Sequence, residues 1–584
     1  MDFTNLMKVL KKDLIHKKNK YNKNIKVTKN NWINKIVFFI TKNYLLTFVF
    51  LFIVGFIVYA NVLKGPMFFD DEHFIQKNKY VQNLDIKKIY TTSVTDGANM
   101  PGNFYRPNQQ LVYSIIYQFF GETSWPYHLT SIFFHIINAV LIFIISKKLK
   151  FSKTASLLAS MFFLLHPIQT ESVSYISGLA DPMSLSLLLS GIIFLLKSLE
   201  KEGTKFDFYF KMISLLFYIA ALFTKENMVI FMVLSVLIIV VYNILYDKKI
   251  INNRYSLYYI IITFLVTITY LILKFTVFNF SEYRGLTGFS NVYTRNLHIR
   301  ILTFISILWD YFKMLIFPFN LNYEKPYVAY TDWFTWRAAF GYILIAFLIF
   351  TIMKFKTKPC LCLSSVWFFA SLIPYTGIIP LNAMYLEHWL YVPVAGVSFF
   401  IASAYDKFKK LKKDQIMIFI MIPVFLLYSV RVIARNEEWA DIEKFYLNEL
   451  KYSKNSLRIY NNLGLYYADV AEKNKENKQY FWNMNRKAES CYKKAISIAD
   501  IYPQPYHNLG NIYLSEGRIK ESFDQYIFAL SIDSNFVYSL IRIAEIYEQN
   551  GNLKKAKIFK DFVSKIESGE KITFAEIQKA LVSE

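Results

Sequence analysis

The chain has 584 residues, of which 54% are hydrophobic and 18% aromatic, and its formal net charge is +24. This apolar content excludes an ordinary soluble globular protein of the same length. The three cysteines, Cys360, Cys362 and Cys491, do not indicate a disulfide framework.

Long apolar segments recur from residue 44 to residue 433 and predict a polytopic bundle of transmembrane helices. About eleven spans are expected, some of which must extend into their flanks. They lie near 44–62, 128–146, 154–166, 183–196, 211–223, 228–246, 255–275, 337–353, 361–378, 388–405 and 416–433. The composition turns polar after residue 433. We therefore expect a basic segment 1–43, a membrane domain 44–433 and a separate domain 434–584.

Basic residues gather in every second connection between these spans. Residues 1–43 carry eleven Lys and two Asp, whereas the loop 63–127 holds six cations and six acids. Further Lys clusters lie in 147–153, 354–358 and 406–414. The positive-inside rule places the basic connections and the N-terminus in the cytoplasm, and the residues after the last span outside. Topology and anionic lipid thus explain most of the positive charge, and no nucleic-acid partner is expected.

Residues 297–318 do not fit this alternation. The segment is apolar but contains His298, Arg300, Asp310 and Lys313. If it crossed the membrane, the basic connection 354–358 would lie outside. We therefore interpret the segment as interfacial or re-entrant, with a twelfth span as the alternative.

An acidic cluster follows the first span within a few residues. Asp70, Asp71 and Glu72 are flanked by aromatic residues. Carboxylates next to hydrocarbon are energetically costly, and residues of this kind usually mark a functional site. The cluster predicts a site at the membrane surface, which suits a substrate that is part lipid. Other polar residues map to the same outer side, and so favour one shared cavity. They are Tyr105, Arg106, His166, Glu171, Asp181, Lys225, Glu226, Glu387 and His388.

The polar C-terminal part contains a degenerate repeat over residues 460–564. Leu509 and Ile543 are equivalent positions 34 residues apart, the period of tetratricopeptide repeats. An earlier copy near Tyr460 holds extra residues at about 472–484. The pattern predicts a short α-solenoid of paired helices, which suits protein binding but could also serve only as a capping module.

The motifs in this order resemble the protein O-mannosyltransferases of the GT-C superfamily, in particular the branch that joins transmembrane helices to tetratricopeptide repeats (TMTC-type). The first is the run FDDEHF at residues 69–74. The others are Tyr105-Arg106-Pro107, HPIQTE at 166–171, Lys225-Glu226, EHWLYVP at 387–393 and RNEEW at 435–439. The resemblance extends from residue 44 to about 564. Two positions depart from it, because Leu179 and His388 stand where arginine is expected.

The resemblance implies an all-α, GT-C-like membrane domain that transfers a sugar, mannose in this branch, from a polyprenyl- or dolichyl-phosphate donor. The acceptor would be a Ser or Thr hydroxyl of a protein held by the repeats, and the reaction would invert the anomeric carbon. Asp70 is the expected general base, and Asp71 would orient the acceptor or act in its place. Arg106 and Lys225 are the expected contacts of the departing phosphate. The other expected substrate-binding residues are His166, His388, Glu171, Asp181 and Glu387.

Several alternatives stay open at this point. A divalent cation could be held by Asp70, Asp71 and Glu171, since hard cations take oxygen ligands. The protein could also be a membrane-anchored repeat scaffold for an envelope complex, or a transferase whose acceptor is a glycan or lipid. The frequent use of Lys, Asn, Ile and Phe favours a prokaryotic source and hence the plasma (inner) membrane; a eukaryotic relative would lie in the endoplasmic reticulum.

Overall fold

The computed structural model describes residues 36–37, 39–100, 102–248, 254–280, 296–325, 328–379, 381 and 383–582. Every regular element among them is a helix, which confirms the all-α prediction. The chain forms two compact units. The first ends at Ala440, and the second begins at Asp441 and includes a short segment around Glu324. The expected segment 1–43 lies largely outside the described residues.

Within the described part, eight helices are long and apolar enough to cross a membrane. They run over Tyr44–Lys64 (α3 and η1), Trp125–Lys148 (α7), Ile176–Glu200 (η5 and α10), Glu226–Leu245 (η6 and α12), Arg254–Thr276 (α13), Trp336–Met353 (α16), His388–Lys410 (η9 and α18) and Asp414–Trp439 (α19). Three further helices overlap the other expected spans. They are α8 (Lys153–Leu165), α11 (Lys205–Leu222) and α17 (Pro359–Leu372). Each of the eleven expected spans therefore coincides with a helix.

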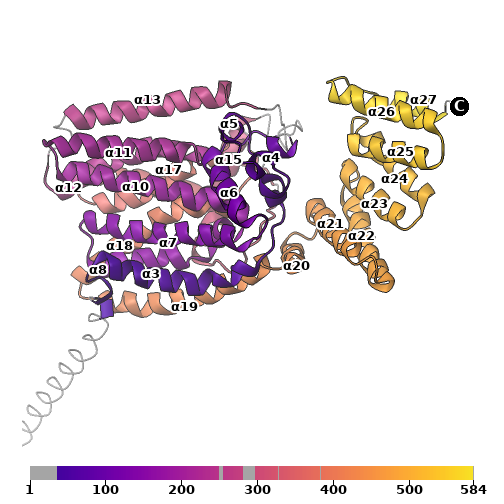
Figure 1. Cartoon of the computed structure of the whole chain (residues 1–584). Helices are drawn as coiled ribbons and strands as arrows, with labels where there is room; N and C mark the ends of the chain where they lie inside the picture. The colour runs from indigo at the N-terminus through magenta and orange to yellow at the C-terminus, as the bar shows by residue number, and fades with distance from the viewer. Residues whose placement is uncertain are drawn as a thin grey trace, which may run out of the picture. The chain divides into compact units, whose positions relative to one another are not determined.

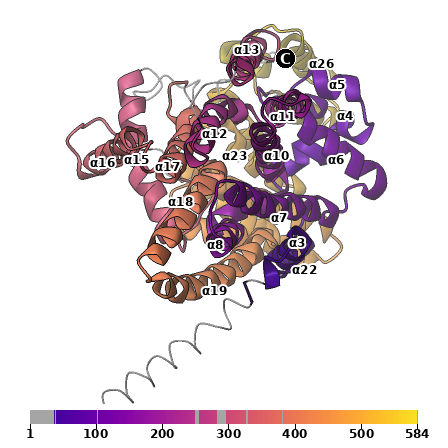
Figure 2. The same cartoon turned by 90° about the vertical axis from the view of Figure 1, so that its left-hand side faces the viewer.

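The long helices lie side by side in one bundle (Figure 1, Figure 2). The segment Ile176–Glu200 lies in its middle, with 78% of its apolar window buried, and α10 packs against α7 and α11. The segments Arg254–Thr276, Trp336–Met353 and Asp414–Trp439 bury only 28%, 17% and 28%. Their outward residues are apolar, as a lipid-facing surface requires.

Residues 297–318, which do not fit the charge alternation, form α15 (Leu297–Ile316). This helix is not among the eight candidate spans. Near its start, the Arg300 Nε–H donates to the carbonyl of Gly377 at 2.5 Å. Near its end, the carbonyl of Leu315 lies 3.0 Å from the ring nitrogen of His166. His166 follows α8 and Gly377 precedes α18, and these two regions meet at one end of the bundle. Both ends of α15 thus contact the same end, which supports the interfacial or re-entrant interpretation.

The long connection after α3 is a packed helical layer at one end of the bundle (Figure 1). Its elements are η2 (Glu72–Gln76), α4 (Lys79–Gln82), α5 (Ile86–Thr91), η3 (Asp96–Ala98) and α6 (Pro107–Phe120). Their apolar side chains, such as Ile75 and Tyr113, form one core with Ile176 and Leu179 of η5 (Ile176–Leu179). The layer is therefore anchored to the start of α10 (Ala180–Glu200), and the acidic cluster lies within this layer.

The second unit contains paired helices, as the repeat pattern predicts. They are α20 (Ile442–Tyr452), α21 (Leu457–Lys473), α22 (Lys478–Ile498), α23 (Pro503–Ser515), α24 (Ile519–Ile532), α25 (Val537–Gln549), α26 (Leu553–Glu567) and α27 (Phe574–Val582). Glycine is needed where the helices of a pair approach closely. A Cβ atom on Gly510 would lie 2.6 Å from the ring of Tyr526, and one on Gly464 would lie 2.5 Å from that of Tyr492.

Two features of the second unit were not expected. First, α19 continues unbroken to Trp439, so the first unit ends at Ala440 and not at residue 433. Second, Glu324, which comes from the connection between α15 and α16, belongs to the repeat unit. Its N–H donates to a Glu449 carboxylate oxygen at 3.0 Å, and its own carboxylate pairs with Arg458 at 2.5 Å.

Candidate active site

The acidic cluster forms a turn in which its first two carboxylates have different surroundings. Phe69 has a left-handed backbone with φ of +57°, which is rare for a bulky residue and is often found at functional sites. Asp71 is buried, whereas Asp70 is exposed. Within the described part of the chain, the Asp70 carboxylate makes no hydrogen bond or ion pair. The turn therefore presents Asp70 and encloses Asp71.

Asp71 attaches the turn to the start of α10. Its Oδ1 accepts a hydrogen bond from the Ser177 N–H at 2.9 Å and another from the Ser177 hydroxyl. Its Oδ2 accepts from the Phe68 N–H at 3.2 Å. With both oxygens used in this way, Asp71 holds two segments 106 residues apart in the sequence.

The turn is also braced by aromatic and amide side chains. The Asp70 N–H donates to the Tyr175 hydroxyl at 2.9 Å, and the Tyr175 ring stacks on Trp439 with centroids 5.3 Å apart. The Ser174 hydroxyl donates to Asn436 Oδ1 at 2.6 Å. Asn436 and Trp439 belong to the RNEEW run, so this motif supports the backbone around Asp70.

Burial makes the charge of Asp71 sensitive to pH. It raises the pKa of Asp71 to about 7, and the hydrogen bonds from Ser177 and Phe68 oppose the rise. The folded protein therefore keeps a proton on Asp71 at pH values where the unfolded chain has lost it. Between about pH 4 and pH 7 the free energy of unfolding should fall as pH rises, by up to about 1.4 kcal/mol per pH unit. In Asp71→Asn this slope should flatten.

Unfolding midpoints of the purified protein in detergent, measured at several pH values, check this prediction. Glu72→Gln is the matched control, because it removes a neighbouring carboxylate that pairs with Lys77 at the surface and leaves the contacts of Asp71 in place. The same slope in Asp71→Asn as in the wild type would contradict the assignment to Asp71.

Cations and acids form two ion pairs beside this turn. Lys225 Nζ lies 2.6 Å from Asp181 Oδ1, and both side chains are buried. Arg106, which precedes α6, lies 3.5 Å from both carboxylate oxygens of Glu226. Burial disfavours the charge of Arg106, but Glu226 and Asp181 outweigh it and raise the pKa of Arg106 above its ordinary value. The two pairs thus act as one electrostatic group.

Tyr113 of α6 links the acidic turn to this group. Burial raises the pKa of Tyr113 well above its ordinary value; the charge of Asp71 adds to the rise and that of Arg106 opposes it. The Tyr113 hydroxyl also donates to the carbonyl of Ile176 at 2.6 Å, directly before Ser177. The structure therefore brings Asp71 and Arg106 to the same small region.

The remaining expected site residues are held within the fold. Glu171 accepts from the His388 N–H at 3.0 Å and lies 2.7 Å from His388 Nδ1. Glu387 is fully buried next to this pair. His166 accepts from the Ile168 N–H at 3.3 Å, so its other nitrogen donates to Leu315 and the ring is neutral. Glu171 is connected to the Lys225 pair through its neighbour Ser172, which lies 3.4 Å from Asp181.

Some contributors to the region were not selected from the sequence. The sequence around Ser177 and Tyr175 contains no pattern that indicates a functional role, because their role depends on the turn that contacts them. Lys274, in the last turn of α13, interacts electrostatically with Glu226 and Arg106. A cation at the end of an apolar run could have indicated it. Leu179, which stands where arginine is expected, is buried in the apolar core with Tyr113.

The three acids considered for a metal ion do not form a metal-binding group. Among the described residues, no three His, Cys, Asp or Glu side chains are grouped so that they could hold one. Asp71 is instead hydrogen-bonded to Ser177 and Phe68, and Glu171 to His388.

The fold and these features define the class: an integral membrane protein with a polytopic helical bundle and a tetratricopeptide-repeat domain. The tetratricopeptide-repeat family model matches residues 503–536. Along most of its length the chain is similar to proteins named protein O-mannosyl-transferase, as the motifs predict. F38B6.6 of Caenorhabditis elegans is 23% identical over 461 residues, which are 77% of this chain and 62% of the relative. Human TMTC3 is 24% identical over 514 residues, 81% of this chain and 54% of the relative.

The chain thus spans between about half and three fifths of the length of these relatives. A solved structure, ArnT from Cupriavidus metallidurans bound to undecaprenyl phosphate, matches with a TM-score of 0.38 and 12% identity. The match covers 86% of this chain and 80% of ArnT.

Proposed function

We propose that the protein is a membrane glycosyltransferase that moves mannose from a polyprenyl- or dolichyl-phosphate donor to Ser or Thr hydroxyls of an acceptor protein. The observation that carries the proposal is the exposed Asp70 carboxylate, held by a turn in which Phe69 has a left-handed backbone. The similarity to protein O-mannosyl-transferases supports the choice of sugar and acceptor. The position of the site next to the membrane helices suits a donor whose leaving group is a lipid phosphate.

In this mechanism Asp70 accepts the proton of the acceptor hydroxyl. The hydroxyl oxygen forms a bond to the anomeric carbon while the bond from that carbon to the phosphate oxygen breaks, so the configuration inverts. The leaving lipid phosphate gains negative charge, which nearby cations stabilise. Arg106 is our first candidate, since its side chain is 14% exposed while that of Lys225 is 5% exposed. Asp71 holds the turn, and Asp181 and Glu226 hold the cations.

His388 is the second candidate for the phosphate, because it stands where the family pattern has arginine and its side chain is 25% exposed. Glu171 would hold it in place. His166 and Glu387 are buried and would shape the cavity. We place the N-terminus in the cytoplasm and the repeats outside, in the plasma membrane if the source is prokaryotic.

Replacing Arg106 by Met should raise the KM for the lipid-linked donor and lower kcat. We expect a loss of about tenfold to a hundredfold in kcat/KM, because one charge-assisted contact to the phosphate is removed. The measurement is transfer from radiolabelled mannosyl polyprenyl phosphate by the purified protein over a range of donor concentrations.

Lys77→Met is the matched control, because Lys77 is an exposed cation of the same outer layer that pairs with Glu72. If Arg106→Met kept wild-type kinetics, Arg106 would not bind the donor phosphate.

A further inference from the structure

Gln169 is a fully buried residue beside the candidate active site, and its side-chain amide is enclosed in an unusual way. It ends η4 (Pro167–Gln169), a short turn that packs against η9 (His388–Leu390) and α19. The residue is 0% exposed, and neither its amide nitrogen nor its amide oxygen has a hydrogen-bond partner among the described residues. Enclosing an amide without such partners costs stability, because its bonds to water are lost.

The other polar side chains of the HPIQTE run at residues 166–171 are bonded within the fold. The Thr170 hydroxyl donates to the carbonyl of Pro167 at 2.7 Å. Glu171 lies 2.7 Å from His388 Nδ1. The enclosed amide is therefore a property of Gln169 alone and not of a loosely packed turn.

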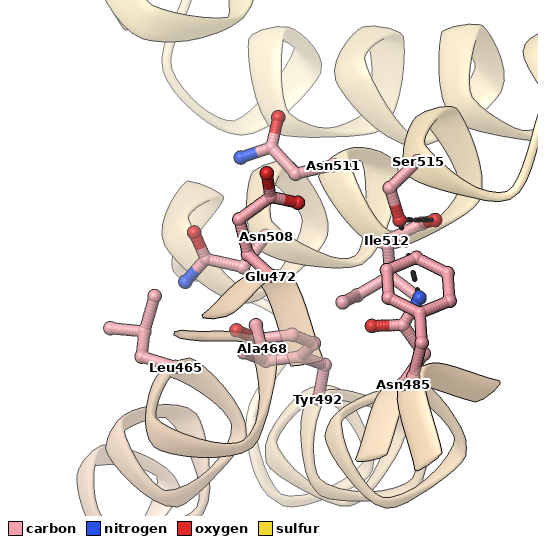
Figure 3. Close-up of a pocket in the computed structure, with 10 residues that line it drawn as sticks. Leu465, Ala468, Glu472, Asn485, Tyr492, Asn508, Asn511, Ile512 and Ser515 are labelled. Carbon is pink, nitrogen blue, oxygen red and sulfur yellow. Dashed lines mark hydrogen bonds between the residues drawn. The ribbon is translucent and has the colours of Figure 1, made fainter. Parts of the chain in front are cut away.

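Other buried amide side chains of the protein find partners. In α6, Gln110 Nε2 donates to the carbonyl of Val94 at 3.1 Å. In the repeat unit, Asn485 lines a pocket and donates to the Ser515 hydroxyl at 3.3 Å (Figure 3). Within the described part of the chain, Gln169 is the only buried Asn or Gln for which both amide atoms lack a partner. A single exception of this kind indicates a group that serves another state of the protein.

Gln169 is also placed near the acidic turn. It directly precedes α9 (Thr170–Ser174), and Tyr175, whose hydroxyl accepts the Asp70 N–H at 2.9 Å, directly follows that helix. At a rise of about 1.5 Å per residue, the backbones of Gln169 and Tyr175 are roughly 9 Å apart. A sugar ring together with an acceptor hydroxyl can bridge such a length. One short helix thus holds the proposed base at one end and the Gln169 amide at the other.

We propose that the Gln169 amide binds a hydroxyl group of the sugar carried by the lipid donor. An amide can donate and accept hydrogen bonds, as a sugar hydroxyl can, whereas a phosphate is bound best by cations. Because the amide is enclosed in this structure, binding requires a segment packed against η4 to move. We expect η9 to move, since it has three residues whereas α19 has 26. The inference rests on the proposed function only where it takes a lipid-linked sugar as the ligand.

Gln169→Met tests whether the amide is a burden on the fold. Met is similar in length but has no amide, so we expect a higher unfolding midpoint of the purified protein in detergent. Gln110→Met is the matched control, since it removes a buried amide that is bonded, and its midpoint should fall. A lower midpoint in Gln169→Met would overturn the inference, because it would show that the amide already stabilises the fold.

Binding of two radiolabelled lipids to the purified full-length protein, without acceptor, tests the contact with the sugar. The probes are mannosyl polyprenyl phosphate and polyprenyl phosphate. In Gln169→Met the dissociation constant of the mannosyl lipid should rise about tenfold, as expected for the loss of one or two neutral hydrogen bonds. That of polyprenyl phosphate should stay the same. An equal shift for both lipids, or no shift for the mannosyl lipid, would overturn the inference.

These binding measurements do not depend on catalysis. If Gln169→Met weakens binding of the mannosyl lipid alone but the wild type transfers no sugar, the inference stands and the proposed function is refuted. If the wild type transfers mannose and Gln169→Met binds both lipids as the wild type does, the proposed function stands and the inference is wrong.

Discussion

Replacing Asp70 by Asn is expected to abolish sugar transfer while leaving the protein folded. Asn has nearly the same shape but cannot accept the proton of the acceptor hydroxyl. Loss of a positioned general base costs on the order of 10² to 10⁴ in rate. The fold should be unaffected, because the Asp70 side chain is exposed and only its N–H contacts Tyr175. The measurement is the initial rate of mannose transfer by purified variants with equal unfolding midpoints.

Glu72→Gln is the control for this experiment, since it removes a neighbouring charge that pairs with Lys77 at the surface. We expect it to transfer at nearly the wild-type rate. Asp71→Asn should differ from both, because it weakens the attachment of the turn to Ser177 and so lowers stability as well as activity. Unchanged transfer by Asp70→Asn would remove the assigned base.

Replacing Lys225 by Met should destabilise the protein strongly. The change leaves the buried Asp181 carboxylate without the cation that lies 2.6 Å away. Removing one partner of a buried ion pair costs about 3–5 kcal/mol, because the remaining charge stays desolvated. Thermal unfolding of the purified protein in detergent measures this loss as a lower midpoint.

The double variant Lys225→Met/Asp181→Leu should recover much of the lost stability, because it removes both charges together. If Lys225 also serves the donor phosphate, this variant will fold but still transfer slowly. Lys148→Met is the comparison, since its pair with Glu200 is partly exposed and worth at most about 1 kcal/mol. An unchanged midpoint in Lys225→Met would show that the buried pair does not support the fold.

The sequence predicted the features that depend on local pattern. Apolar runs located the eleven helices, and the 34-residue period located the repeat, because each signal lies within one element. The charge alternation also predicted an interfacial or re-entrant α15, and the contacts of both its ends with one end of the bundle support that interpretation. These predictions did not require knowledge of distant contacts.

Features set by distant contacts were not predicted. Asp70 and Asp71 are adjacent in sequence, yet only Asp71 contacts Ser177, 106 residues away, and this separates their roles. The place of Glu324 in the repeat unit follows from its contacts with Glu449 and Arg458, more than a hundred residues later. No local pattern contains such information.

The most direct test of the account is transfer of radiolabelled mannose from mannosyl polyprenyl phosphate to protein by the purified chain. The wild type should label Ser or Thr of an acceptor with inverted configuration, and Asp70→Asn should not. Label appearing in glycan or lipid would keep the transferase and replace the acceptor. Transfer that is equal in both proteins, or absent from the wild type with every lipid-linked sugar offered, would contradict the account and favour a membrane-anchored scaffold.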